Sequence, residues 1–320
     1  MHILIFDSPA LYCKLSHLMP KFFKILPALL LCVCACARAY TLSDAAGQVF
    51  EFENPPKIAC ITPSVSETIL DLDCGDKLLG VSRYCSYPKG LAKSQERERI
   101  LNSKPRLGGF IDPDYEKILL LKPDLFVIPL TSSNTQADKV KKMGIKVFFT
   151  YPDGIDSVAK NTLLLGELFG KKPLAEKLVA DFEAEISKTA GISPEKRPRA
   201  LFLFGKMAAG CGSYVGELMN LCGFLNVADA AKKPWPVLSR EAVLTLNVEI
   251  LILEAKDEEA FLRQKSELEA DKVWAATPAF KSGEVYFVET DAVIRPSLRL
   301  KKAVAALANI REKHLKKALK

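Results

Sequence analysis

Four aromatic side chains stand beside proline or glycine where strands are expected to end, and they are the residues of this sequence best suited to hold a ligand. They are Tyr84, Tyr87, Phe110 and Trp235. Ligand-binding loops of open α/β sheets lie at strand ends, and large flat side chains there can stack on a large flat ligand. Three arginines, Arg83, Arg295 and Arg299, could meet an anionic ligand. Ordinary loop packing and solvation are the competing explanations for all seven residues.

Sequence signatures of enzymes and metal sites are weak. The motifs GxSxG, GxxxxGK[ST] and HExxH do not occur, and Gly210–Gly216 reads GxGxxxG, one residue too long for a dinucleotide loop. We expect that segment to lead into a helix starting at Ser213. Of three histidines, His2 and His17 precede the expected mature chain, which excludes a catalytic histidine pair. We therefore expect no enzyme and no metal ligated by the protein; a nucleotide-dependent α/β enzyme is the most distant alternative.

Seven short runs of β-branched and aromatic residues alternate with helical patterns, which indicates an α/β fold with mostly parallel sheets. The runs are 58–62, 78–82, 125–129, 146–150, 200–204, 250–254 and 285–288. The fourth and fifth runs are separated by about fifty residues of helical composition, which begin near Asp156 and are interrupted at 170–173. Pro173 suits the first turn of a new helix, which we expect to reach about Lys188 and to join two domains.

The segment Ser64–Glu67 precedes an apolar run and fits a capping box. In that motif the hydroxyl and the carboxylate satisfy free backbone amides at a helix start. We therefore predict a helix that is capped by Ser64 and Glu67.

A weak repeat at an offset of 125 residues links the two halves of the chain. Residues 116–128 align with residues 241–253, apolar on apolar at nearly every position, and both segments read as a short helix followed by a strand. Each copy begins with a glutamate, Glu116 or Glu241, in a first turn where the helix dipole favours an acid. The repeat predicts two similar lobes that present like surfaces.

The first 39 residues have the pattern of an export signal. Lys21 and Lys24 precede an apolar run over 25–35, and Ala37–Ala39 provides small residues for cleavage. The run is shorter than the ~20 apolar residues of a membrane span. Translation from Met1 and from Met19 both remain open. In an alternative to cleavage after residue 39, Cys36 is lipidated and anchors the protein.

Charge and cysteine content depend on removal of this leader. Loss of residues 1–39 removes four basic residues and one acidic residue, so the net charge falls from +7 to +4. The remaining charges are mixed along the chain, and we expect no nucleic-acid binding. Five cysteines remain, namely Cys60, Cys74, Cys85, Cys211 and Cys222. The spacing of Cys211 and Cys222 permits a disulfide in an exported protein, and a small buried residue is the alternative for each cysteine.

Five motifs follow one another along the chain, namely IACITPSVSETI (58–69), GVSRYCSYP (80–88), GGFIDP (108–113), LKPDL (121–125) and PWPVLSRE (234–241). In this order they resemble the class III periplasmic substrate-binding proteins of ABC importers, in the cobalamin- and iron-siderophore-binding family. The similarity runs from about residue 55 to residue 311 and is greatest to the cobalamin-binding members. It implies an α/β fold with two Rossmann-like lobes, central mostly parallel sheets, a single rigid bridging helix and a ligand cleft between the lobes. The implied limits are 1–39 for the signal peptide, 55–170 for the N-terminal lobe, 171–190 for the bridging helix and 191–320 for the C-terminal lobe.

The resemblance also assigns residues. Ligand contacts of the family fall on Tyr84, Phe110, Trp235 and Asp291, and Arg83 and Arg295 are further candidates. Phe110 stands where the family often has tryptophan, and an aromatic contact that follows the strand ending at Phe204 has no counterpart. The docking glutamates of the family, one per lobe, fall on Glu116 and Glu241, the residues that the repeat pairs.

The implied function is binding and delivery. The resemblance implies a monomeric, non-enzymatic periplasmic protein that captures a cobalt corrinoid and delivers it to an ABC permease dimer in the inner membrane. No cofactor is expected to be bound permanently, because the metal arrives already chelated. The same role for haem or an iron–siderophore complex is the alternative, with Arg83 or Arg295 facing carboxylates or Tyr84 serving as an axial ligand of haem iron.

Overall fold

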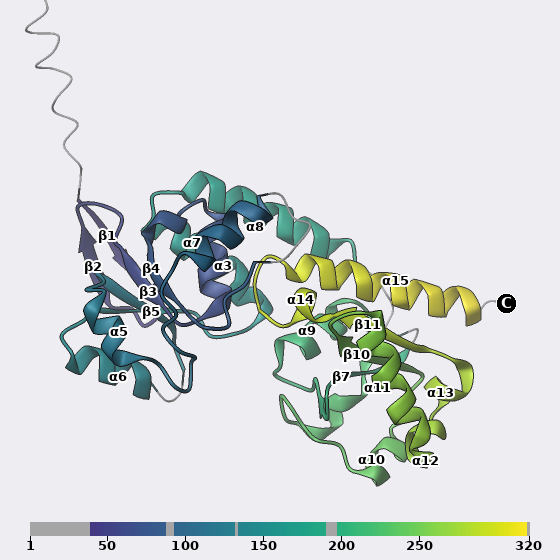
Figure 1. Cartoon of the computed structure of the whole chain (residues 1–320). Coiled ribbons are helices and arrows are strands. Elements are labelled where there is room, and N and C mark those ends of the chain that lie inside the picture. Colours follow the sequence, from purple (N-terminus) through teal and green to yellow (C-terminus); the bar gives the residue numbers. More distant parts are fainter. Residues whose placement is uncertain (1–38, 88–92, 132–133, 190–196, 319–320) are drawn as a thin grey trace, which may run out of the picture. The chain divides into compact units, whose positions relative to one another are not determined.

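The computed structural model describes residues 39–87, 93–131, 134–189 and 197–318 (Figure 1). Residues 1–40 with 51–54 form one unit, and residues 41–50 with 55–320 form a larger one that contains both central sheets. Two short strands that precede these sheets in sequence, β1 (Tyr40–Ser43) and β2 (Val49–Phe52), pair with each other. The expected export signal and Cys36 lie outside the described residues. The site is built within the larger unit.

The first lobe contains a four-stranded parallel sheet with the order β4-β3-β5-β6. Its strands are β3 (Ile58–Cys60), β4 (Leu78–Val81), β5 (Leu125–Pro129) and β6 (Val147–Thr150). Its helices are α3 (Pro63–Asp71), η2 (Gly75–Lys77), α4 (Ser94–Asn102), α5 (Tyr115–Leu120) and α6 (Thr135–Lys142). Every residue of β5 and β6 is buried, as expected for a parallel sheet covered on both faces. Ile118 of α5 and Val140 of α6 pack with Phe126 in one core, and α3 packs against β3 and β4.

The second lobe repeats this topology. Its strands are β7 (Arg199–Phe204), β8 (Met207–Ala208), β9 (Leu225–Asn226), β10 (Ile250–Ala255) and β11 (Val285–Glu289). Its helices are α9 (Tyr214–Leu221), η4 (Val227–Ala231), α10 (Arg240–Thr245), α11 (Glu258–Ala270), α12 (Lys272–Ala275), α13 (Pro278–Ser282), α14 (Thr290–Val293) and α15 (Leu300–Ala318). The parallel strands run β9-β7-β10-β11, and β8 is antiparallel to β7. Both lobes therefore have the parallel strand order 2-1-3-4.

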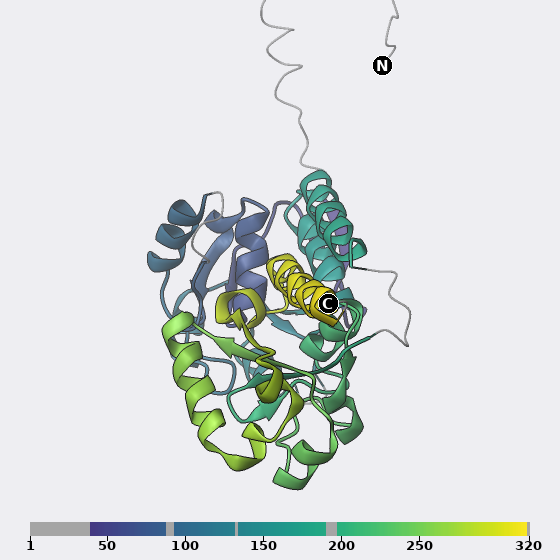
Figure 2. The ribbon, with the colours of Figure 1, turned by 90° about the vertical axis from the view of Figure 1, so that its right-hand side faces the viewer.

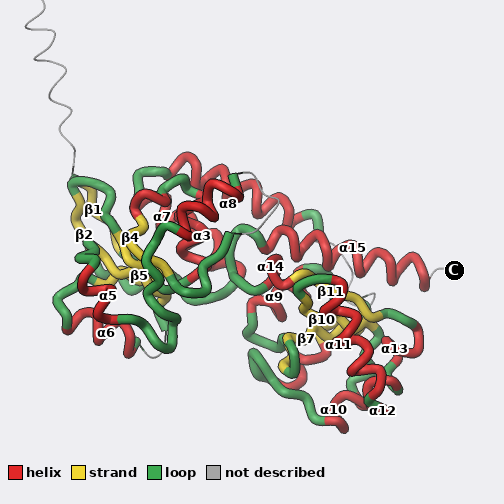
Figure 3. Tube along the Cα trace, viewed as in Figure 1, coloured by secondary structure: helices red, strands yellow, loops and turns green. Residues whose placement is uncertain are grey.

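Alternate residues of β7 supply two cores, one on each face of this sheet. Phe202 packs with residues of α9 and α15, whereas Leu201 and Leu203 pack with Phe261 of α11 and Ala279 of α13. This alternation follows from the two-residue period of a strand. The second sheet is thus covered by helices on both faces, as Figure 3 shows.

Two helices connect the lobes in sequence and pack against each other, α7 (Ile155–Leu168) and α8 (Lys172–Ser187). Pro173 occupies the first turn of α8, as predicted. Gly166 allows the close approach of the two helices, because a Cβ there would lie 2.3 Å from the Cβ of Ala175. Ile155 of α7 and Phe182 of α8 are buried in the core of the second lobe, and α7 also contacts α3 of the first lobe. Helix α8 lies within the range 171–190 predicted for the bridge, and α7 packs beside it.

The final helix, α15, lies against α8 and β11 (Figures 1 and 2). Its last turns are held by Glu284, whose carboxylate accepts hydrogen bonds from Lys317 Nζ at 2.8 Å and from Tyr286 at 2.9 Å and contacts His314 Nδ1 at 3.2 Å. At 19 residues α15 is longer than α8, yet no helix in the described part of the chain is long and apolar enough to cross a membrane.

The fold class predicted from the sequence is confirmed. All seven predicted strands are present, each within two residues of its predicted bounds, and the sheets are mostly parallel. The structure adds β8 and β9, which have only two residues each and leave little trace in the sequence pattern. The chain is an α/β protein with two Rossmann-like lobes.

The disulfide considered for Cys211 and Cys222 is not formed. All five described cysteines are free; Cys211 is exposed, and the Sγ of Cys222 lies 3.9 Å from the carbonyl oxygen of Val304 inside the second lobe. Burial raises the pKa of the Cys222 thiol to about 12 and that of Cys60 to about 12. These two cysteines are small core residues with unreactive thiols.

Candidate functional site

A cavity of about 480 Å³ lies at the carboxyl ends of the first lobe's parallel strands. Its wall includes Thr62–Ser64 after β3, Tyr84 after β4, Thr131 after β5 and Asp153 after β6, together with Phe110 and Ile294–Pro296. In the sheet order β4-β3-β5-β6, the strands that follow β3 in sequence are added first on one side of it and then on the other, so the strand order reverses between β3 and β5. Open α/β sheets bind ligands at such switch points. The volume falls within the ~300–1,000 Å³ that is typical of small-molecule sites. The second lobe contributes to this wall through residues 294–296.

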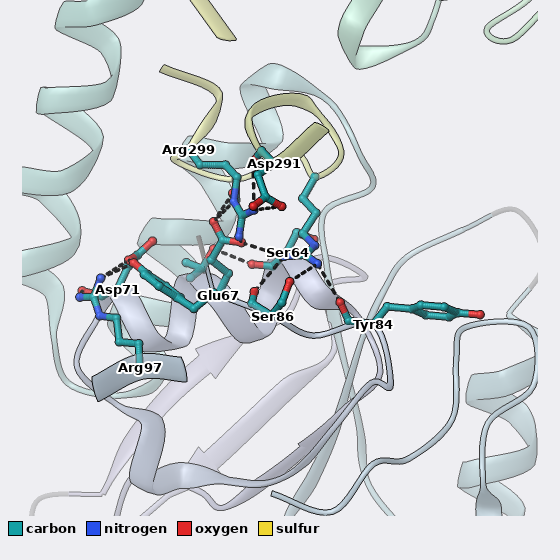
Figure 4. A network of polar contacts seen from close by, with 12 residues as sticks. Ser64, Glu67, Asp71, Tyr84, Ser86, Arg97, Asp291 and Arg299 are labelled. Carbon is teal, nitrogen blue, oxygen red and sulfur yellow. Dashed lines mark hydrogen bonds and ion pairs between the residues drawn. The ribbon is translucent and has the colours of Figure 1, made fainter. Parts of the chain in front are cut away.

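Tyr84 is held in a tight turn directly after β4. The backbone N–H of Cys85 donates to Ser82 O at 3.1 Å, and that of Tyr84 donates to the Ser82 hydroxyl at 3.3 Å. Both bonds fix the backbone and leave the ring projecting away from the turn (Figure 4). The residue is 62% exposed, which is high for an aromatic side chain at a cavity wall. Such a ring can stack on a flat ligand without first breaking a core contact.

Phe110 reaches the cavity because two glycines precede it. Gly108 has a φ of +82°, and a Cβ there would lie 2.3 Å from Asp112 O. Gly109 lies under the ring of Tyr84, since a Cβ at this position would approach the ring to 2.8 Å. The loop thus requires glycine twice, first for its turn and then for contact with the tyrosine.

Arg83 and Arg295 are bound by acceptors of the protein itself. Arg83 pairs with the carboxylate of Asp112, and its guanidinium lies 5.7 Å from the centre of the Tyr84 ring. Arg295 donates to Tyr84 O at 2.7 Å, to Ser86 O at 2.9 Å and to the Ser86 hydroxyl at 3.0 Å. Burial, and then the positive charge of Arg299, lower the pKa of Arg295 below its usual value. Both side chains support the turn that carries Tyr84.

Trp235 belongs to an aromatic cluster in the second lobe. Its ring contacts Phe204 edge-on, with centroids 5.4 Å apart, and Tyr214 at 6.1 Å. The hydroxyl of Tyr214 donates to Val293 O at 2.6 Å. Burial raises the pKa of this phenol. Sequence reasoning looked for an aromatic partner in the loop after Phe204 and missed this cluster, because Tyr214 comes from the next helix.

Asp291 borders a different cavity, of about 680 Å³, between α4 and the start of α14. Its side chain is 61% exposed, and its backbone oxygen accepts from Arg299 Nη1 at 3.0 Å. Of the six predicted ligand residues, the structure thus brings Tyr84, Phe110 and Arg295 to the 480 Å³ cavity and places Arg83 beside it. Trp235 and Asp291 lie outside the described wall of that cavity.

The repeat of the sequence is also a repeat of backbone structure. Helix α10 follows α5, and β10 follows β5, at an offset of 125 residues at their first residues. The helices are capped at equivalent positions by Asp114, which accepts from Lys117 N, and Ser239, which accepts from Ala242 N. Two positions beyond the last residue of each helix lies a residue with positive φ, Lys122 at 46° and Asn247 at 48°.

Glu116 and Glu241 occupy the same place in these repeated units. Both lie in the exposed first turn of a short helix, six residues after Phe110 and Trp235 respectively. Hydrogen bonds from its own backbone N–H and from the Ser239 hydroxyl hold the pKa of Glu241 below its usual value. Each lobe therefore presents one loop aromatic and one exposed carboxylate on a single loop–helix unit.

Glu67 joins the lobes, and sequence reasoning assigned it the wrong role. Helix α3 begins at Pro63 with Thr62 as its N-cap, and no side chain caps it. Proline suits this first position because it has no N–H to satisfy, so the predicted capping box is wrong. The Glu67 carboxylate instead accepts from the Ser297 hydroxyl at 2.8 Å and from Arg299 Nε at 2.5 Å, with a second contact to Arg299 Nη2 (Figure 4).

Asp71 lies one turn after Glu67 in a second polar group. Its carboxylate accepts from the Tyr87 hydroxyl at 2.5 Å and from Arg97 Nη1 at 2.6 Å. Burial raises the pKa of Asp71 to about 6; the Tyr87 hydrogen bond opposes this, the charge of Glu67 adds to it, and the charge of Arg97 opposes it. Burial and the charge of Asp71 also raise the pKa of Tyr87. This group ties α4 to α3.

In the part of the chain that the structure describes, no group of three or more His, Cys, Asp or Glu side chains is arranged to hold a metal ion. The cavity offers the aromatic rings of Tyr84 and Phe110, several hydroxyl side chains, and the charged side chains of Asp153 and Arg295. That combination can hold a flat organic molecule or a metal that is already chelated.

The family of the chain follows from comparison with known proteins. Residues 58–292 match the periplasmic binding protein family, so the chain belongs to that family, whose members bind substrates for ABC transporters and are not enzymes. A cobalamin-binding protein of Halobacterium salinarum is 24% identical over 283 residues, which cover 86% of this chain and 74% of that protein.

Two solved structures show the same fold. The periplasmic vitamin B12-binding protein BtuF of Vibrio cholerae has a TM-score of 0.64 and 22% identity, over 82% of this chain and 99% of that one. The periplasmic haem-binding protein RhuT of Roseiflexus sp. RS-1 has a TM-score of 0.66 and 21% identity, over 80% of this chain and 97% of that one. Likeness at this identity establishes the two-lobed fold, and it does not separate one ligand from another.

Proposed function

We propose that this periplasmic binding protein captures a cobalt corrinoid and delivers it to an ABC permease. The cavity at the strand ends is the observation that carries the proposal, because the exposed ring of Tyr84 and the ring of Phe110 line it together. Two aromatic side chains on short, constrained loops suit a large flat ligand. The cobalamin-binding relative spans most of the chain and favours this ligand.

The aromatic cluster around Trp235 would form the second contact surface, with Asp291 binding a polar side arm of the corrinoid. Both residues belong to the second lobe, where Asp291 lies in α14 directly after β11 and Trp235 precedes α10. Trp235 occupies the position in the repeat that Phe110 occupies in the first lobe. Arg83 and Arg295 would bind an anionic side group of the ligand with those guanidinium N–H groups that do not donate to acceptors of the protein. The protein would supply no metal ligand.

Haem is the second candidate, and Tyr84 is the observation that favours it. Its exposed phenol at the cavity wall could bind ferric iron as an axial ligand. An iron–siderophore complex in the same role would rely on Arg83 and Arg295 for its anionic groups.

A direct screen tests the ligand. Purified protein is incubated separately with cyanocobalamin, haemin and a ferric hydroxamate, and each mixture is passed through a gel-filtration column. We expect the cyanocobalamin absorbance to co-elute with the protein at one equivalent. Co-elution of haemin or of the hydroxamate, without co-elution of cyanocobalamin, would refute the corrinoid and identify that compound as the ligand.

Docking to the permease is proposed for Glu116 and Glu241. Two exposed carboxylates on separate lobes, at matched positions of a structural repeat, suit a partner that carries two equivalent cationic sites. Exposed leucines lie one turn further on, Leu119 and Leu120 in α5 and Leu244 in α10, and would add apolar contact. The protein would act as a monomer, one per permease dimer.

A pair of matched double variants tests docking. Glu116→Ala with Glu241→Ala should leave corrinoid affinity unchanged and abolish most uptake, because neither glutamate is among the residues that line the cavity. The control is Glu96→Ala with Glu258→Ala, which removes one exposed first-turn glutamate from each lobe. Normal uptake by the Glu116/Glu241 variant would refute the docking role.

The remaining proposals concern processing and domain limits. We propose export through residues 1–39, with cleavage after Ala39 or, alternatively, lipidation of Cys36. The proposed lobes are residues 55–170 and 191–320, joined by 171–190. Mass spectrometry of the mature protein would identify the N-terminal residue and any attached lipid.

A further inference from the structure

We infer that Glu67, Arg295 and Arg299 form a latch that holds the two lobes in one orientation and fixes the turn that carries Tyr84. Glu67 lies in α3 of the first lobe, and Arg299 lies just before α15 of the second lobe (Figure 4). Arg295 lies in the same segment, between α14 and α15. The contacts therefore cross between lobes, with Glu67 and Arg299 separated by 232 residues in sequence.

The latch is buried and rich in charge. The side chains of Glu67 and Arg299 are 3% and 1% exposed, and Arg299 binds both carboxylate oxygens of Glu67. Arg295 Nη1 lies 3.7 Å from the same carboxylate. Two cations thus share one buried anion, and removal of that anion leaves both without an equivalent partner. A buried charge that loses its partner is strongly unfavourable, so the lobes should remain closed on this contact.

Arg295 connects the latch to the cavity. Its guanidinium donates to Tyr84 O and to both oxygens of Ser86, so it binds the backbone on either side of Cys85. The same residue belongs to the cavity wall together with Tyr84. Glu67 and Arg299 are positioning residues in this arrangement, because they set Arg295 and, through it, the turn of Tyr84. This second step rests on the proposed function; the coupling of the lobes does not.

The test compares two buried glutamates, Glu67 and Glu284. Glu67→Gln breaks the charge of the latch but keeps its shape. Glu284→Gln is the matched control, because Glu284 is also 3% exposed and contacts three side chains, all of them in the second lobe. Both variants should lower the melting temperature, and only Glu67→Gln should change the relation between the lobes.

The distance between lobes is measured by pulsed electron paramagnetic resonance. Spin labels are attached to cysteines introduced at exposed positions of α6 and α11, Lys142→Cys and Ser266→Cys, after Cys211→Ser removes the one exposed cysteine among the residues that the structure describes. We expect a narrow distance distribution for the parent protein and for the control variant Glu284→Gln. For Glu67→Gln we expect a broader distribution. Equal widths for all three proteins would overturn the latch.

Binding of cyanocobalamin, measured on the same proteins, tests the effect on Tyr84. We expect Glu67→Gln to bind about tenfold more weakly than the parent, and Glu284→Gln to bind equally well. Unchanged affinity with a broadened distance would overturn the coupling to Tyr84 while leaving the latch. Failure of the parent to bind cyanocobalamin would refute the proposed ligand, and the distances would still decide the latch.

If Glu67→Gln does not fold, Ser297→Ala, which removes one donor to Glu67, replaces it in the distance measurement. This variant should broaden the distribution less than expected for Glu67→Gln, and a distribution equal to that of the parent would overturn the latch.

Discussion

The buried carboxyl of Asp71 predicts an unusual pH dependence of stability. Burial raises its pKa from 3.8 to about 6, a shift of about 2 units. Each unit corresponds to ~1.36 kcal/mol, so ionisation of Asp71 should cost about 3 kcal/mol of folding free energy. Between about pH 4 and pH 6 the folded protein holds a proton that the unfolded chain has lost. The contribution of Asp71 to stability is therefore present below about pH 4 and is lost as the pH rises through about 6.

Asp71→Asn isolates this contribution, because the amide oxygen can still accept from Tyr87 and the side chain no longer titrates. Urea unfolding of both proteins at pH 4.5, 5.5 and 7.0 gives their free energies of unfolding. We expect the value for the parent minus that for the variant to fall by about 2 kcal/mol across this range, because about 1 kcal/mol of the effect is already lost at pH 4.5.

Asp73 provides a control of opposite sign. Burial tends to raise its pKa, but the hydrogen bond and charge of Lys93 outweigh that effect and hold the pKa below its usual value. The stability that Asp73 contributes is present above about pH 4 and is lost on acidification. The free energy of unfolding of the parent minus that of Asp73→Asn should therefore become smaller as the pH falls. A parent-minus-Asp71→Asn difference that is flat or rises with pH would refute the reasoning for Asp71.

Two further predictions concern the aromatic residues of the site. Gly109→Ala places a methyl group where the Tyr84 ring lies at 2.8 Å, so the ring must move; cyanocobalamin should bind at least several-fold more weakly in calorimetry, and unchanged binding would show that the ring position is irrelevant. Trp235→Ala should weaken binding by roughly 1 to 3 kcal/mol, as for an anchor that the ligand buries, whereas Trp274→Ala, which removes the other tryptophan from α12, where it packs against a core of the second lobe, should affect stability alone. Equal affinities for the two tryptophan variants would remove Trp235 from the site.

Elements whose pattern is local were predictable from the sequence. The apolar run at 125–129 became β5 with the same bounds, and Pro173 opened α8 as expected. Glu116 and Glu241 were paired by sequence alone, because each sits at the start of a local helix–strand unit. The structure adds that the units match down to the positive φ of Lys122 and Asn247.

Contacts that depend on distant partners were not predictable in the same way. The local rule for a helix start predicted a capping role for Glu67. Its actual partner, Arg299, is 232 residues away in sequence and reaches it only in the folded protein. Every residue of α3 from Val65 to Leu70 is buried. A glutamate within this short, largely apolar helix was the available signal that its charge has a buried partner. The cluster of Tyr214 with Trp235 likewise joins two segments that no local pattern connects.

The central claim is that a corrinoid binds at the cavity lined by Tyr84 and Phe110. Calorimetric titration with cyanocobalamin of the parent protein and of the variant with Tyr84→Ala and Phe110→Ala tests it most directly. We predict one site per parent protein and a loss of at least about tenfold in affinity, or about 1.4 kcal/mol, in the variant. No heat of binding with the parent protein, or equal affinity of the two proteins, would contradict the claim.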